Sequence, residues 1–205
     1  VKELRLKGAD QETTADLDTI ASEAGRLAVL VEEARRLSLS RDAFEHRRPF
    51  APGEVIIQTA RLYRPILERR STALDVDIQE GLPQVYGSPD ELTQVLFNLL
   101  TNAGKHTEGG RVSVSACCED GLITVIVADN GSGIAPDLLP HIFEGLVSEE
   151  SATADGKRGM GLGLMVCAAI VQAHGGAIWA ENNARGGAGF FFTLPLREEE
   201  ESAHA

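Results

Sequence analysis

The chain has 205 residues, of which 43% are hydrophobic, and this apolar content is enough for a globular core. Its formal net charge is −12, and its Lys and Arg residues form no dense patch, so nucleic acid is not expected as a partner. No apolar run approaches the roughly 20 residues that span a bilayer, so we expect no direct membrane contact from this chain.

The three cysteines, Cys117, Cys118 and Cys167, are odd in number and lack the spacing of metal ligands. Adjacent residues of a strand point to opposite faces, so Cys117 and Cys118 would not share a site. We therefore expect free, buried thiols in a reducing compartment. This indicates a cytoplasmic location for the chain, in a parent protein that is either soluble or membrane-anchored.

Residues 13–38 are expected to form an amphipathic helix. Apolar side chains recur every three or four positions, in a stripe close to a heptad seam: Leu17, Ile20, Ala24, Leu27, Val31, Ala34 and Leu37. One helix cannot bury such a stripe alone, so we expect it to dimerise or join a helical bundle. The alternative is that it packs against the globular part of its own chain.

Prolines and a glycine within residues 47–53 break this helix and mark a domain boundary. We place a first segment at residues 1–48, a globular domain at 49–197 and an acidic tail, expected to be disordered, at 198–205. Periodicity then predicts a helix over 56–70, a strand over 73–78 and a short extended piece over 83–86.

The sequence next predicts a helix over residues 89–106. Ser88 and Glu91 form a capping box around Pro89, with the Glu91 side chain expected to reach back to the cap. One helix face is apolar, and another carries Glu91, Gln94, Asn98, Asn102 and Lys105. A polar row is usually a solvated face. This one contains several amides, which can hold a metal ion or a polar ligand.

A β-hairpin is expected next, with a strand through residues 112–116, the turn Asp120-Gly121 and a nearly continuous apolar strand over 122–129. Asp129 ends that buried strand. A buried carboxylate needs a hydrogen-bond donor, and the exocyclic amine of adenine is one. The alternative is a common Asx turn from Asp129 into Gly131. Gly131 and Gly133 allow a backbone path that leaves space for a base.

The glycine-rich segment 159–164 leads into a helix expected over 163–174. Free N–H groups at such a helix start suit phosphate oxygens. The small, polar segment 149–158 before it is expected to be a mobile lid. Strands over 177–181 and 189–196 flank a glycine-rich turn and close the domain.

Several separated motifs resemble, in order and spacing, the catalytic and ATP-binding domain of bacterial sensor histidine kinases, which are Bergerat-fold ATPases. They are NLLTNAGKHT at 98–107, DNGSGI at 129–134, HIFE at 141–144, RGMGLGL at 158–164 and HGG at 174–176. The resemblance covers about residues 50–196, and residues 26–31 look like the second helix of the family's dimerisation and phosphotransfer domain. It implies an α/β two-layer sandwich, with a mixed, mostly antiparallel sheet covered by helices on one face, preceded by a bundle helix.

The resemblance also implies that the chain binds ATP and Mg²⁺. Asn102 would hold the Mg²⁺ ion, Asn98 and Lys105 would line the phosphate channel and act in catalysis, and Asp129 would accept from the adenine amine. Phe143 would anchor the lid, and the glycines of segment 159–164 would form its hinge. The other nucleotide-binding positions that the resemblance implies are His106, Gly131, Gly133, Ile134, Lys157, Arg158, Gly159, Gly161, Leu162, Gly163 and Leu164.

Asn98 distinguishes branches of this superfamily. In the gyrase, mismatch-repair and chaperone ATPases the equivalent position is a glutamate that activates water, and an amide cannot act as that base. We therefore expect slow hydrolysis and transfer of the γ-phosphoryl group to a histidine. The family further implies a homodimer through the N-terminal helix and a response regulator receiver domain as partner.

The chain departs from the family because it lacks the phosphoacceptor motif. None of its histidines precedes a sequence such as Glu-Leu-Arg-Thr-Pro: His46, His106, His141, His174 and His204. By the family's spacing the acceptor would precede Val1, so truncation is favoured over natural loss. Two alternative functions remain, a nucleotide-binding interaction module without phosphotransfer and a serine kinase of the anti-sigma-factor type.

Overall fold

The computed structural model describes residues 47–144, 162–184 and 186–196. The chain divides into two compact units, residues 1–46 and 47–205, and only the second contains described residues. The expected helix over 13–38, the expected lid and the acidic tail all lie outside the described residues. None of the described helices is both long and apolar enough to cross a membrane.

The second unit opens with a short strand, β1 (Arg48–Phe50), and a helix, α3 (Pro52–Glu68). The sequence predicted this helix from residue 56, which is too late. Pro52 lies in the first turn of the helix, where the backbone N–H of any residue lacks an intrahelical acceptor. The missing N–H of proline therefore costs no hydrogen bond, and the helix is not interrupted. Strand β1 pairs antiparallel with β3 (Val85–Gly87) to form a separate two-stranded sheet.

The main sheet has the strand order β2-β4-β5-β7-β6. Its strands are β2 (Ala73–Ile78), β4 (Arg111–Glu119), β5 (Leu122–Asp129), β6 (Ile178–Asn182) and β7 (Ala188–Pro195). Strands β2 and β4 are parallel, and the other neighbours are antiparallel. The predicted hairpin is confirmed: its turn residues Asp120 and Gly121 both have positive φ, 49° and 76°, as a type I′ turn requires.

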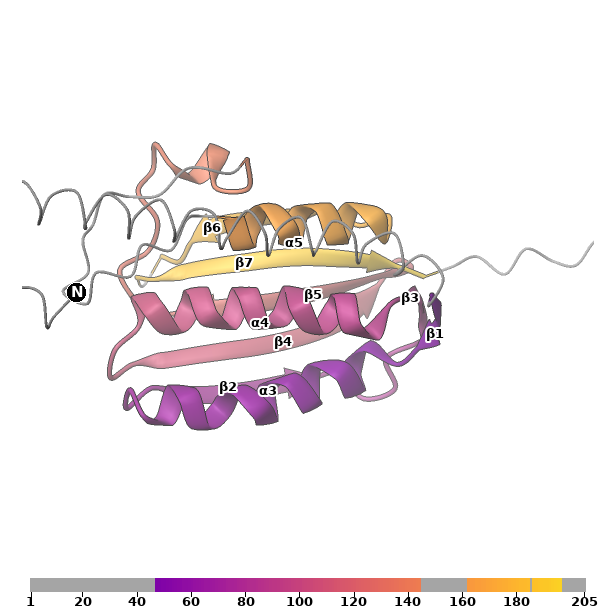
Figure 1. The fold of residues 1–205 in the computed structure, drawn as a ribbon, viewed down its shortest axis with the longest axis horizontal. Coiled ribbons are helices and arrows are strands. Elements are labelled where there is room, and N and C mark those ends of the chain that lie inside the picture. The colour runs from indigo at the N-terminus through magenta and orange to yellow at the C-terminus, as the bar shows by residue number, and fades with distance from the viewer. Residues whose placement is uncertain (1–46, 145–161, 185, 197–205) are drawn as a thin grey trace, which may run out of the picture. The chain divides into compact units, whose positions relative to one another are not determined.

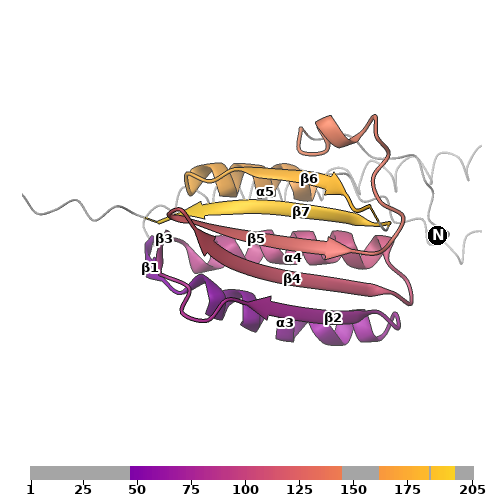
Figure 2. The same cartoon turned by 180° about the vertical axis from the view of Figure 1, so that it is seen from behind.

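Three helices cover one face of this sheet: α3, α4 (Pro89–His106) and α5 (Leu162–Ala173) (Figure 1). Figure 2 shows the opposite face of the sheet, over which no described helix lies. The predicted two-layer sandwich with a mixed, mostly antiparallel sheet is therefore confirmed.

The core lies between the sheet and its helices, and α4 is central to it. Alternate residues of β5 are buried on that side, namely Ile123, Val125 and Val127. The apolar stripe of α4 packs on them with Leu92, Val95, Leu96, Leu99, Leu100 and Ala103. Because this stripe fixes the rotation of α4 about its axis, the amide-bearing face is held away from the sheet.

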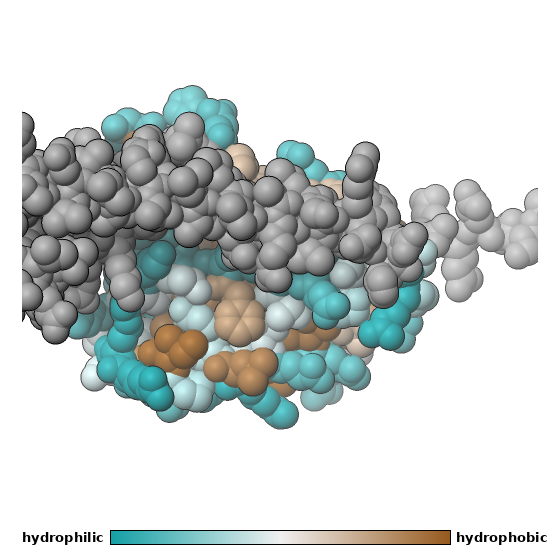
Figure 3. Space-filling model, viewed as in Figure 1, coloured by the Kyte–Doolittle hydropathy of each residue, from teal (hydrophilic) through white to brown (hydrophobic). Residues whose placement is uncertain are grey.

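The surface over α3 is partly apolar. Figure 3 shows apolar side chains gathered along α3 and between α3 and α4. Ile57, Leu62 and Ile66 of α3 are exposed, Leu62 by 66%. The cysteines are free, and Cys167 is buried as predicted, but Cys118 is only half-buried. Cys117 is exposed, because it lies on the face of the sheet that the helices leave uncovered.

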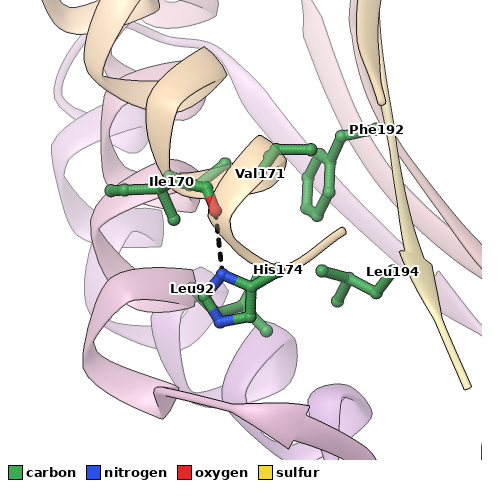
Figure 4. Close-up of a pocket in the computed structure, with 7 residues that line it drawn as sticks. Leu92, Ile170, Val171, His174, Phe192 and Leu194 are labelled. Atoms are coloured by element: carbon green, nitrogen blue, oxygen red, sulfur yellow. Dashed lines mark hydrogen bonds between the residues drawn. The ribbon is translucent and has the colours of Figure 1, made fainter. Parts of the chain in front are cut away.

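The start of α4 is held by a residue distant in sequence. Ser88 Oγ accepts from the Glu91 N–H at 3.3 Å, as the capping box predicts. The expected return bond from the Glu91 side chain is wrong. The Ser88 N–H instead donates to Nε2 of His174 at 3.1 Å, while Nδ1 of His174 lies 2.9 Å from the Ile170 carbonyl oxygen (Figure 4). These partners require Nδ1–H to donate and Nε2 to accept, so the ring is neutral here.

Replacing Gly87 by alanine should destabilise this end of the domain. A Cβ at residue 87 would lie 2.2 Å from Cδ2 of His174, so the ring must move and release the Ser88 N–H. We expect a loss of about 2–3 kcal/mol in the free energy of unfolding, from overpacking and a broken hydrogen bond. Urea denaturation followed by the fluorescence of Trp179 measures it. Gly53→Ala, a change within α3, is the control, and equal stability of the two variants would contradict this role of Gly87.

Candidate functional site

The amide-bearing face of α4 forms one side of the candidate site. Nδ2 of Asn98 donates to the Gly163 carbonyl at 3.1 Å and so joins α4 to the start of α5. Asn102 lies one turn further along α4 and is half-buried. Lys105 and His106 are exposed in the last turn of the helix. This end of α4 therefore offers an amide and two basic side chains to a polar or anionic ligand.

Asp129 forms a second part of the site, at the end of β5, and is only 6% exposed. Its Oδ1 atom accepts two backbone hydrogen bonds, from the Gly131 N–H at 2.8 Å and from the Ala188 N–H at 3.3 Å. The first bond is the Asx turn that the sequence offered as an alternative. No donor among the described residues reaches Oδ2. Asp129 therefore makes the turn with one oxygen, and its second oxygen is left without a donor among the described residues.

The glycine turn after Asp129 lies against the end of α4. A Cβ at Gly131 would lie 2.1 Å from the His106 carbonyl oxygen, so only glycine fits there without a shift of the backbone. Gly133 has a φ of 75°, which also favours glycine. The turn thus places the carboxylate of Asp129 and the polar end of α4 at one edge of the sandwich.

Three residues at the end of β6 and in the β6–β7 connection, which the sequence analysis did not single out, lie against this turn. The amide of Asn182 makes two 2.7 Å hydrogen bonds to the backbone of Ile134, and Nδ2 of Asn183 donates to the Asp129 carbonyl at 3.0 Å. Gly187 has a φ of 85°, and a Cβ there would lie 2.0 Å from the same carbonyl oxygen. Adjacent asparagines before a Gly-Gly pair were the available signal, but it indicated only a turn.

The model of the histidine kinase-, DNA gyrase B- and HSP90-like ATPase family matches residues 87–198, from the start of α4 to just beyond β7. This match spans more than half of the chain. The chain belongs to this ATPase family.

Sensor kinases are among its relatives. The adaptive-response sensory kinase SasA of Trichormus variabilis is 40% identical over 129 residues, which cover 62% of this chain and 32% of SasA. The histidine-protein kinase BaeS of Escherichia coli is 30% identical over 204 residues, covering 94% of this chain and 42% of BaeS. The chain therefore spans about a third of SasA and less than half of BaeS.

A solved structure agrees with this assignment. Full-length ShkA in complex with AMPPNP superposes with a TM-score of 0.63 at 32% identity, over 73% of this chain and 31% of ShkA. The resemblance to the catalytic and ATP-binding domain of sensor histidine kinases is thus confirmed.

The remaining predicted site residues of this ATPase domain have different surroundings. Phe143 is half-buried and packs edge-to-face on Phe190, with ring centroids 6.4 Å apart. Leu164 is 8% exposed and is part of the hydrophobic core. Gly163 is held by Asn98, as described above. Lys157, Arg158, Gly159 and Gly161, together with the side chain of Leu162, lie outside the described residues.

Oγ1 of Thr107 is among the buried polar atoms that have no hydrogen-bond partner among the described residues. Thr107, which ends α4, is 2% exposed, and no described residue forms a hydrogen bond with its Oγ1. This atom lies 2.9 Å from the position of a Cβ at Gly131, so it faces the glycine turn. An unpaired buried hydroxyl is uncommon in folded proteins, and it fits a site whose bound state adds water or a polar ligand group.

Proposed function

We propose that this domain binds ATP with Mg²⁺ and transfers the γ-phosphoryl group to a histidine on a separate protein segment. The observation that carries the proposal is the buried carboxylate of Asp129, which has a free oxygen beside the polar end of α4. In this proposal Oδ2 accepts from the adenine amine, and the triphosphate lies along Asn98, Asn102 and Lys105. The AMPPNP bound to the related ShkA supports a nucleotide in this fold.

Magnesium fits the donors of this site. Among the described residues, no cluster of three or more His, Cys, Asp or Glu side chains exists that could hold a metal. An ion here would need amide, phosphate and water oxygens, which Mg²⁺ accepts. We assign its protein ligand to the amide oxygen of Asn102. Bound Mg²⁺ would neutralise charge on the phosphates.

Asn98 supports phosphoryl transfer over hydrolysis. Its Nδ2 is committed to the Gly163 carbonyl, and its amide oxygen has no appreciable basicity. The Asn98 side chain cannot remove a proton from water, so hydrolysis of bound ATP is expected to be slow until an acceptor histidine arrives. Lys105 would stabilise the charge of the transferred group.

The surroundings of His174 fit an acceptor on another segment. Both ring nitrogens of His174 are engaged within the fold, and its side chain is only 3% exposed. We further propose that the parent protein works in the cytoplasm, dimerises through residues 13–38 and passes phosphate to a response regulator.

Phosphorylation in trans tests the function. The chain is incubated with γ-labelled ATP, Mg²⁺ and a separate dimerisation and phosphotransfer fragment of a sensor kinase. We expect label on the fragment that is lost in acid and retained in base, as phosphohistidine is. Acid-stable label would instead identify a serine kinase. ATP binding without any transfer would identify an interaction module.

A further inference from the structure

Asn182 makes a two-point contact with the turn that follows Asp129. Its Oδ1 accepts from the Ile134 N–H and its Nδ2 donates to the Ile134 carbonyl, each at 2.7 Å and across 48 positions of sequence. The amide thus pairs with the backbone as a neighbouring strand would. Among the described residues, no other hydrogen bond holds the backbone of Ile134.

The two adjacent asparagines hold both ends of the segment from Asp129 to Ile134. Asn183 binds the carbonyl at the first end, and Asn182 binds the backbone at the second. Gly133, which precedes Ile134, leaves room for the Asn182 amide. Its φ is 75°, and a Cβ there would lie 3.0 Å from Oδ1 of Asn182. The segment therefore has a fixed length and path between Asp129 and Ile134.

The fold itself has little need of this contact. Strand β6 is already paired with β7 from Ile178 to Asn182. Asn182 is also an exposed residue, so its side chain adds little to the core. The hydrogen bonds of its side chain therefore stabilise the turn at Ile134 and not the pairing of the sheet.

From these contacts we infer that Asn182 is a positioning residue for recognition of the nucleotide base. It acts through the backbone of Ile134, which ends the turn that begins at Asp129. This inference rests on the proposed function, in which adenine binds to Asp129 beside this turn. Losing the contact frees the end of the turn, so the site should lose base affinity and base selectivity while its phosphate contacts remain.

Calorimetry on the full 205-residue chain with Mg²⁺ separates these effects. The ligands are ATP, GTP and inorganic triphosphate, and the proteins are wild type, Asn182→Ala, Asn182→Asp and the control Glu181→Ala. Asp has the size of Asn but turns an oxygen toward the Ile134 carbonyl, so the paired contact is lost. Because ATP and GTP carry equal charge, the ratio of their dissociation constants is insensitive to the charge that Asp adds.

We expect both Asn182 variants to bind ATP roughly 5- to 30-fold more weakly, the effect of losing about two hydrogen bonds partly open to water. The preference for ATP over GTP should fall by a similar factor. Asn182→Ala should bind inorganic triphosphate as wild type does, and Glu181→Ala should resemble wild type throughout.

An ATP-to-GTP ratio in either Asn182 variant equal to that of wild type would overturn the inference. So would an equal loss of ATP and triphosphate affinity in Asn182→Ala, because that result indicates a general structural role. A wild-type chain that binds no ATP would instead refute the proposed function. Wild-type binding that depends on Asp129 but not on Asn182 refutes this inference alone.

Discussion

Replacing Asp129 by asparagine should weaken ATP binding by about 100-fold. The amide oxygen of the new side chain can still accept from the Gly131 and Ala188 N–H groups, so the turn is retained. The second oxygen, however, becomes an NH₂ group that faces the adenine amine, donor against donor. A hydrogen bond to a charged group contributes about 1.5–3 kcal/mol, and an opposed donor adds to the loss.

Titration of the variant with ATP and Mg²⁺ by calorimetry measures this effect. Asp77→Asn is the matched control. Asp77 is exposed on the edge strand β2, so this substitution changes the net charge by the same amount at a position away from the turn. Thermal unfolding should show that Asp129→Asn remains folded. Equal ATP affinity in the two variants would mean that Asp129 does not recognise the base.

Replacing Asn102 by alanine should remove the Mg²⁺ dependence of ATP binding and slow phosphoryl transfer by roughly 100- to 1000-fold. The amide oxygen of Asn102 is the proposed protein ligand of the ion. Metal stabilisation of phosphoryl charge is worth several kcal/mol, and about 1.4 kcal/mol corresponds to a factor of ten in rate. Alanine is a good helix former, so α4 should be preserved.

The measurements are ATP affinity with Mg²⁺ and with a chelator, and the initial rate of transfer to the acceptor fragment. Gln94→Ala provides the control, because Gln94 is an amide on the same helix, two turns before Asn102, and is also half-buried. If Asn102→Ala kept the Mg²⁺ dependence and transfer rate of Gln94→Ala, the assignment of Asn102 to the metal would be wrong.

The elements with strong local signals were predictable from the sequence. Helix α4 begins and ends where predicted, because proline and Ser88 define its start and a regular apolar stripe fills its length. The Asp120-Gly121 turn likewise fixed the β4–β5 hairpin. Strand β1 was missed, since its three residues include Pro49 and carry no periodic pattern. Its partner β3 was expected only as an extended piece.

The candidate site could be proposed from the sequence only where its residues stand in recognisable motifs. Asp129 and the amides of α4 were identified in this way, whereas Asn182 and Asn183 were not. They reach the glycine turn because β7 lies beside β5 and β6 lies beside β7, and hydrogen bonds from side chain to backbone leave no pattern in sequence. Glu91 shows the same limit. The capping-box motif predicted that the Glu91 side chain would accept from the Ser88 N–H. Nε2 of His174, 86 positions from Ser88, accepts from that N–H instead.

A crystal structure of the chain with AMPPNP and Mg²⁺ tests the central claim most directly. The account predicts the adenine amine within hydrogen-bond distance of Oδ2 of Asp129, with the phosphates and the ion along Asn98 and Asn102. Nucleotide bound elsewhere, or an adenine ring that makes no contact with Asp129, would contradict it.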